Sequence, residues 1–218
     1  MRTTRSHERL TPIAQRSLAL VTVSGSNLFF VLYVIAAWCY PGGSNANRAA
    51  FGFNIYTNYW CDLLGSHAKN GQLNPAQPIA FTAMLELCLT LAYFWYVTPA
   101  VFNFPKPAQR FLQTAGALSM IVAPFIFTAH HDTIINIAGS LGVLAMLGTF
   151  AGLYKNQHAG LFRVGLGCLF LCGLNNYMYY THWFIEHLPI IQKITFFLFL
   201  LWFCFVSLTL RGKPMAHE

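Results

Sequence analysis

Charged side chains are scarce in this sequence. Only 9% of its 218 residues are Asp, Glu, Lys or Arg, and only six residues are acidic. Ordinary soluble domains carry about 25% charged residues, so the composition excludes a soluble globular domain. The sequence also lacks an internal repeat and a low-complexity stretch. What it has in abundance is apolar side chains, which make up 56% of the chain.

Six apolar runs are each close to the length of about 20 residues that a helix needs to cross a bilayer. We predict transmembrane helices at residues 18–40, 78–102, 111–129, 133–154, 162–181 and 189–210. The expected fold is an all-α polytopic membrane bundle, with a basic arm at 1–17, a transmembrane domain at 18–210 and a tail at 211–218. The first run lacks a small-residue cleavage site, which favours a mature helix over a removed signal peptide.

The basic residues predict the orientation of these helices. A net charge of +7 could indicate a nucleic-acid partner, but the charges alternate with the predicted spans. One side has only Arg48, Lys69 and Lys193, whereas the other has Arg2, Arg5, Arg9, Arg16, Lys106, Arg110, Lys155, Arg163, Arg211 and Lys213. By the positive-inside rule the second side is cytoplasmic, and both termini lie there. We therefore expect membrane lipids as partners, and no nucleic acid.

Residues 41–77 form the one long connection, on the predicted outer side. Its stretch FGFNIYTNYWCDLLG is rich in aromatic residues, which favour membrane interfaces. We expect an ordered extracytoplasmic cap, in which this stretch packs on the bundle as a short helix or re-entrant segment and covers the outer histidines. Cys39 and Cys61 both fall toward this side, where a disulfide and two free thiols are equally compatible with the sequence.

Histidines gather in the outer junctions between the predicted spans. The candidate metal ligands are His130 and His131, between spans three and four, and His182 and His187, between spans five and six. Imidazole nitrogens suit Zn²⁺, so zinc is the cofactor expected at such a site. The spacing matches neither H-E-x-x-H nor another strict metal motif. The alternative is that these histidines are only the polar ends of helices that contact water.

Three acidic residues are candidates for catalysis. Asp132 follows the paired histidines and Asp62 lies in the cap, and either could act as a base or orient an imidazole. Glu86 lies about eight residues into the second predicted span, or ~12 Å below the outer surface. An ionisable group within a span marks a functional site by default. The competing interpretation of Glu86 is a hydrogen-bonded structural carboxyl that burial keeps protonated.

Three short motifs resemble a known family. They are the acidic end of an aromatic outer segment (NYWCDLLG), a proline-led second span (NPAQPIAFTAM) and a histidine near the junction of spans three and four (AHHDTIINIAG). In this order they are similar to the six-span bacterial membrane proteins of the DUF998 family, and distantly to the Frag1/DRAM/Sfk1 proteins. The resemblance covers most of the chain and implies a bacterial inner-membrane protein. Cys61 stands where a serine often precedes the acid.

A remoter similarity is to the CREST group of ceramidase-like membrane hydrolases. It would imply a zinc ion held by three histidines, a serine and an aspartate. The His-x-x-x-His motif of that group is not matched by His182 and His187, which are five residues apart.

Two functions therefore compete, and the sequence does not decide whether the protein is an enzyme. The first is a metal-dependent hydrolase or transferase that acts on lipid at the outer face, with the histidines as ligands. The alternative is a non-enzymatic protein that binds a lipid or a membrane partner, or that passes a small solute through a pocket around Glu86. The partner in that case is left open, a second copy of the chain included.

Overall fold

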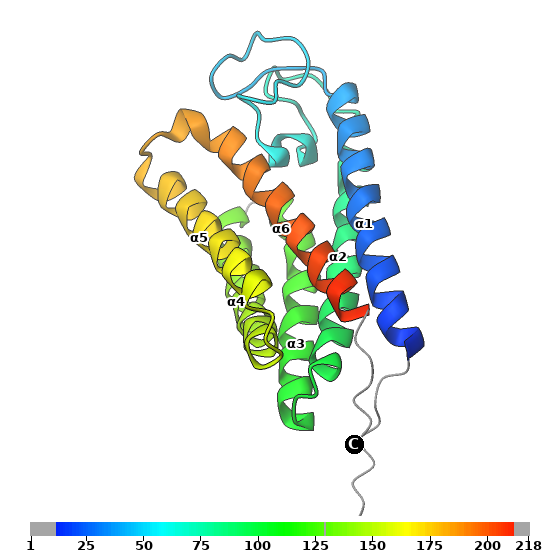
Figure 1. Ribbon diagram of the computed structural model, residues 1–218. Helices are drawn as coiled ribbons and strands as arrows, with labels where there is room; N and C mark the ends of the chain where they lie inside the picture. Colours follow the sequence, from blue (N-terminus) through cyan, green and yellow to red (C-terminus); the bar gives the residue numbers. More distant parts are fainter. Residues whose placement is uncertain (1–11, 129, 212–218) are drawn as a thin grey trace, which may run out of the picture.

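The computed structural model describes residues 12–128 and 130–211, and this part of the chain is built from helices (Figure 1). Six helices are long: α1 (Pro12–Cys39), α2 (Gln77–Val101), α3 (Lys106–Val122), α4 (His131–Lys155), α5 (Ala159–Thr181) and α6 (Leu188–Arg211). Three short 3-10 helices join them: η1 (Trp60–Leu64), η2 (Ala123–Phe127) and η3 (Ile185–His187). The prediction of an all-α fold is confirmed. Most of the predicted arm and tail lies outside the described residues.

Five of the long helices (α1, α2, α4, α5 and α6) are long and apolar enough to cross a membrane. The chain is therefore a membrane-embedded helical protein. The helix α3 is shorter, with 17 residues, and it ends at Val122 rather than continuing to residue 129 as predicted. The reason is Pro124, which has no N–H group and clashes with the carbonyl four residues earlier, so the chain tightens into η2.

The bundle is closed by contacts between its first and last helices. Each long helix packs against the next one along the chain, and α6 packs against α1. Aromatic rings fill the interface of α2 and α6, where the ring of Phe203 lies 4.8 Å from that of Phe94 and 5.7 Å from that of Trp95. The helix α5 is the least buried of the five candidate spans.

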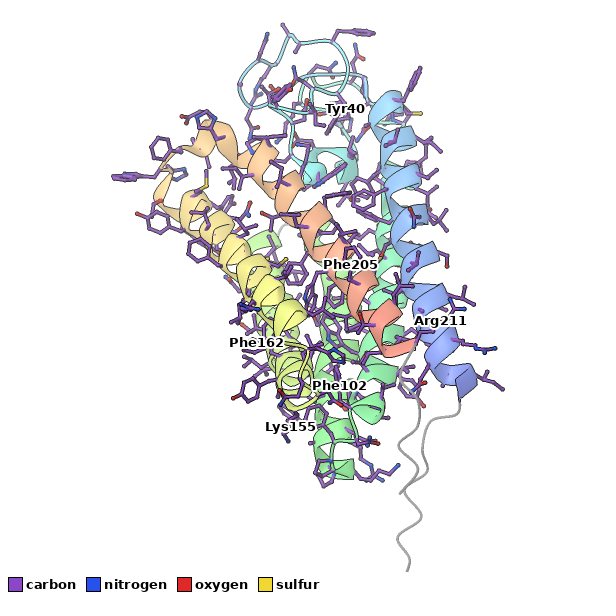
Figure 2. The ribbon with its side chains drawn as sticks, in the orientation of Figure 1. Tyr40, Phe102, Lys155, Phe162, Phe205 and Arg211 are labelled. Atoms are coloured by element: carbon purple, nitrogen blue, oxygen red, sulfur yellow. The ribbon has the colours of Figure 1, made fainter. Side chains whose placement is uncertain are left out.

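The long loop after α1 covers one end of the bundle, which we call the cap end (Figure 1). The cap, residues 40–76, lies beyond the last turn of α1 and the first turn of α2. The cap end also carries η2 and the start of α4, and the turn from α5 to α6. At the opposite end lie the two remaining connections and the end of α6; Figure 2 shows Phe102, Lys155 and Arg211 toward this end and Tyr40 at the cap end.

Hydrogen bonds from side chains stabilise the conformation of the cap more than helical hydrogen bonds do. This differs from the short helix expected for its aromatic stretch. Within that stretch only η1 is helical. The amide of Asn54 donates to Asn58 Oδ1 at 3.0 Å, and the amide of Tyr56 donates to Asn54 Oδ1 at 2.8 Å. Asparagine side chains that capture backbone amides in this way compete with helix formation. The cap also depends on a glycine: Gly43 has φ +81°, and a Cβ there would lie 2.3 Å from the amide nitrogen of Asn70, so a larger residue would not fit.

Candidate functional site

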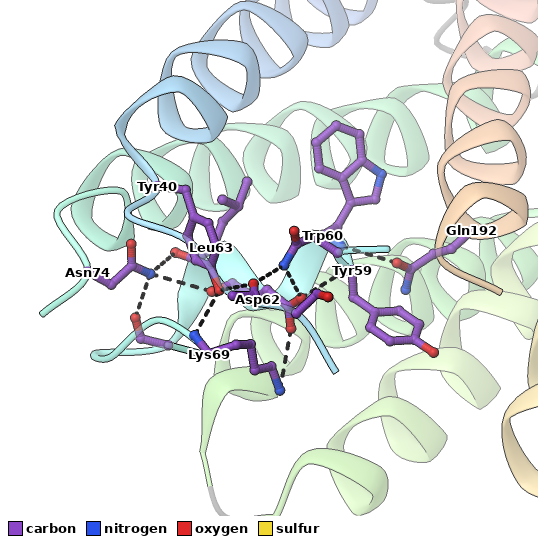
Figure 3. Close-up of polar contacts among 12 residues, drawn as sticks. Tyr40, Tyr59, Trp60, Asp62, Leu63, Lys69, Asn74 and Gln192 are labelled. Atoms are coloured by element: carbon purple, nitrogen blue, oxygen red, sulfur yellow. Dashed lines mark hydrogen bonds and ion pairs between the residues drawn. The ribbon is translucent and has the colours of Figure 1, made fainter. Parts of the chain in front are cut away.

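Asp62 is the centre of the polar network in the cap (Figure 3). Asp62 is buried, with 6% of its surface exposed. Its Oδ2 accepts hydrogen bonds from Asn58 Nδ2 at 3.0 Å and from the Tyr59 amide at 2.9 Å. Its Oδ1 lies 3.5 Å from Lys69 Nζ. Both oxygens of this candidate base are thus engaged within the cap, where the carboxylate orders the loop around it.

A second carboxamide fixes the chain that follows Asp62. Asn74 is buried, and its Nδ2 donates to the carbonyls of Gly65 at 2.8 Å and Leu63 at 3.1 Å. Its Oδ1 accepts from the amide of Ala76 at 3.1 Å, at the start of α2. The loop from η1 to α2 is therefore closed by one side chain. This positions the segment of the cap that carries Lys69.

Lys193 connects the cap to α6, and it was not among the candidate site residues predicted from the sequence. Its Nζ donates to the carbonyl of Asn58 in the cap and, at 2.9 Å, to that of Pro189 one turn earlier in α6. The ammonium also lies 5.5 Å from the ring centre of Phe53 and 5.7 Å from that of Trp60. Such a cation between two rings is stabilised by their quadrupoles. The signal in the sequence was a lone lysine in an otherwise apolar span.

A pocket of about 310 Å³ opens between the cap and the end of α3. It is lined by Cys61, Asp62, Leu64, Gly65, His67, Lys69, Ile126 and Thr128. We call it the cap pocket. It brings residues 61–69 of the cap to the segment just before His130. The cap was expected to cover the outer histidines, but His130, His182 and His187 are exposed, so the prediction is wrong for these three.

The charge in the cap pocket comes mainly from Lys69. The side chain of Lys69 is 39% exposed, whereas that of Asp62 is 2% exposed, so the cation faces the solvent and the anion does not. His67 is exposed and its Nδ1 lies 3.2 Å from Ser66 Oγ. Burial, with a smaller contribution from the neighbouring Asp62 carboxylate, raises the pKa of the Cys61 thiol to about 11, so this thiol is neutral near pH 7.

Residues of the junction between α3 and α4 contact two different parts of the structure, the cap pocket and α5. Thr128 lines the cap pocket and its Oγ1 accepts from the His130 amide at 3.4 Å. The side chain of His130 is exposed, and that of His131 lies outside the described part of the structure. Asp132 instead turns to α5, where its Oδ1 accepts a hydrogen bond from Tyr179 Oη at 3.2 Å.

The junction between α5 and α6 is a strained turn. His182 ends α5 with φ +59° and Phe184 follows with φ +52°, both in the left-handed region. His187 is exposed, and its Nε2 lies 3.6 Å from Oε1 of the adjacent Glu186. His187 also borders an apolar groove of about 360 Å³, whose other lining residues are Leu174, Tyr177, Met178, Trp183, Phe184 and Ile191.

The predicted metal ligands do not form a complete site in the described part of the chain. Among the described side chains, no three His, Cys, Asp or Glu residues come together in a way that could hold a metal ion. The described residues connect the two junctions through Asp132 and Tyr179 rather than through imidazoles. Because the side chain of His131 is outside this description, zinc binding by His130, His131, His182 and His187 stays a prediction.

The remaining candidates lie apart from the cap pocket. Glu86 is on α2 and lines neither of the two pockets described above. Cys39 and Cys61 are both free thiols, with Cys39 exposed at the end of α1. Of the two states that the sequence left open, the structure therefore has the unpaired one.

No family model, no curated protein and no solved structure matches this chain. The resemblance to the DUF998 family therefore stays a prediction.

Proposed function

We propose that this chain is a six-span membrane protein that binds the anionic headgroup of a lipid in the cap pocket, without catalysing a reaction on it. In this proposal the cap end faces the outside of the cytoplasm, with both termini inside. The observation that carries it is the partly exposed side chain of Lys69, a cation that lines a pocket at the end of the membrane-spanning helices.

The length of α3 with η2 supports the sixth span. At 1.5 Å per residue for α3 and about 2.0 Å for η2, the two together extend roughly 35 Å, against ~30 Å for the hydrocarbon core. The basic residues of the described chain support the orientation. Lys106, Lys155 and Arg211 lie at the opposite end of the bundle, as the positive-inside rule requires of a cytoplasmic face.

The hydrogen bonds around Asp62 support anion binding. An ammonium group has three donors, and Lys69 directs its Nζ to a single described acceptor, Asp62 Oδ1, at 3.5 Å. The other carboxylate oxygen is covered by Asn58 and Tyr59. The second cation, Lys193, is bound to the carbonyl of Asn58. The pocket therefore keeps spare donors on Lys69 for a phosphate or carboxylate, while Lys193 is taken up by backbone carbonyls.

The rest of the lining fits an amphiphile. Thr128 and His67 offer further polar groups beside Lys69, and Leu64 and Ile126 offer apolar surface. Lipid headgroups lie at the level of the helix ends, so the pocket is where a headgroup would reach it without leaving the bilayer. Phosphate is common to a phospholipid headgroup and to the free ion, and the test below distinguishes them.

The test is the binding of phosphatidylglycerol to the full-length protein in nanodiscs of phosphatidylcholine. A charge-assisted hydrogen bond contributes about 1.5–3 kcal/mol, so Lys69→Gln should weaken binding by roughly ten- to a hundredfold. Thr128→Val should weaken it less, and Lys69→Arg should retain it. The matched control is Arg48→Gln, which removes one exposed positive charge from the same loop outside the pocket.

Equal effects of Lys69→Gln and Arg48→Gln would contradict a specific headgroup site. Competition by inorganic phosphate at similar concentrations would identify a soluble anion as the ligand instead of a lipid. Turnover of the lipid by the purified protein, lost in His182→Ala, would favour the metal-dependent enzyme over the binding protein.

A further inference from the structure

Glu86 lies against α1 at a point where the two helices touch. A Cβ on Gly25 of α1 would lie 2.1 Å from Thr90 Oγ1 and 2.7 Å from Glu86 Oε1. Only a glycine allows this approach, because any other side chain would push the helices apart. Thr90 Oγ1 donates to Glu86 Oε1 at 2.9 Å, so α2 supplies the one described hydrogen bond of the carboxyl group.

Buried polar atoms lie on α1 and α2 close to this contact along the chain. Glu86 Oε2 and Thr22 Oγ1 are hidden from the surface and have no hydrogen-bond partner among the described residues, and Ser26 Oγ is hidden beside the Cys204 thiol. Thr22 is 0% exposed and Ser26 is 3% exposed, and both are on α1, one turn before and one residue after Gly25. Polar atoms left unpaired in a span are costly, and in membrane helices they mark functional positions.

The surroundings of Glu86 favour an uncharged group. Glu86 lies ~13 Å along α2 from its first residue, and it forms no ion pair among the described residues. The titratable side chain that interacts with it is the thiol of Cys88 on α2, and on α6 the Sγ of Cys204 lies 3.9 Å from the carbonyl oxygen of Thr22. A carboxylate with one hydrogen bond and no cation would be far more costly there than a carboxylic acid.

We propose that Glu86 is a proton-binding site in the membrane interior, occupied at neutral pH. A proton is the ligand that fits, since the contact with Gly25 leaves no room for a larger one on that side of the carboxyl group. Release of the proton requires water to reach Oε2, which is hidden from the surface and has no described partner. A charge on this group would lie directly against α1 at Gly25, so the bound proton favours the close approach of the two helices there, independently of any ligand in the cap pocket.

The test compares two carbodiimides on the full-length protein at neutral pH. The Glu86 residue is only partly buried, so dicyclohexylcarbodiimide, which partitions into the apolar phase and adds to protonated carboxyl groups, can approach it there. A water-soluble carbodiimide with an amine modifies carboxyl groups exposed to water. Glu186, whose side chain is 65% exposed, is the matched internal control. We expect the apolar reagent to modify Glu86 and the water-soluble one to modify Glu186, as read by mass spectrometry of peptides.

The variant Glu86→Gln should lose the apolar adduct and keep its elution volume in detergent. The variant Lys69→Gln should keep the adduct, which separates this site from the headgroup site. An unmodified Glu86 after treatment with the apolar reagent would overturn the proposal. Modification of Glu86 by the water-soluble reagent as readily as Glu186 would overturn it too.

Discussion

Replacing Lys193 with methionine should release the cap from α6. Methionine keeps the unbranched apolar stem and removes the ammonium that donates to the carbonyls of Asn58 and Pro189. Asn58 is 1% exposed, so its carbonyl would stay buried without that donor, at a cost of about 1–3 kcal/mol. The lost contacts with the rings of Phe53 and Trp60 add roughly 0.5–1 kcal/mol each.

Part of this loss is offset, because the variant no longer buries a charge. We expect a net loss of about 2 kcal/mol in the free energy that holds the cap closed, which corresponds to roughly 30-fold faster exchange of amides whose exchange follows the opening equilibrium of the cap. The measurement is hydrogen–deuterium exchange of peptides covering residues 53–62 in detergent. These peptides contain the Tyr59 and Trp60 amides, which donate to Asp62 Oδ2 and Gln192 Oε1.

The control is Ile194→Met, which introduces the same side chain at the next position, where the native residue is half exposed. Its cap peptides should exchange as in the unaltered protein. If Lys193→Met leaves the exchange of residues 53–62 unchanged, the ammonium does not hold the cap and the reasoning is refuted. The same conclusion follows if both variants accelerate exchange equally.

Two further predictions concern a thiol and a glycine contact. The pKa of the Cys61 thiol is raised to about 11, so its reactive thiolate is scarce near pH 8 and increases about tenfold per pH unit up to that value. Iodoacetamide should therefore label the exposed Cys39 before Cys61, and equal labelling rates would contradict this. Gly165→Ala should lower Tm by overpacking worth about 1–3 kcal/mol, because its Cβ would lie 2.5 Å from a ring carbon of Phe150. Gly167→Ala, with no atom within 4 Å of the new Cβ, should leave Tm unchanged or higher, and an equal fall in both variants would argue against the packing of α5.

The long apolar runs were sufficient to predict the helices. The last two spans, predicted at 162–181 and 189–210, correspond to α5 (Ala159–Thr181) and α6 (Leu188–Arg211). The prediction failed where one residue outweighed the composition. Residues 111–129 read as a continuous apolar run, but Pro124 ends α3 at Val122. The proline was visible in the sequence, and its effect on hydrogen bonding was underestimated.

The cap was harder to predict, because its conformation depends on side chains that bind backbone groups. The aromatic residues correctly indicated a segment that packs on the bundle, and Phe53 and Trp60 do lie against Lys193. Its expected helix is limited to η1, since asparagines take up backbone amides that a helix would use. Asp62 was predicted to act as a base or to orient an imidazole, and the structure shows it bound to Asn58, Tyr59 and Lys69 within the cap, so its part in catalysis stays a prediction.

The sequence by itself determined the class of the protein, because the scarcity of charge and the length of the apolar runs are local properties that each helix carries alone. It also determined the presence of polar residues in the connections at the cap end. Only the tertiary structure decided which of them meet. The contact of Asn58 with Lys193 joins residues 135 positions apart, the cap pocket joins Lys69 to Thr128, and the approach of α1 to Glu86 depends on Gly25. Such contacts arise from the packing of whole helices against one another, and no local pattern of residues encodes which side chains that packing brings together.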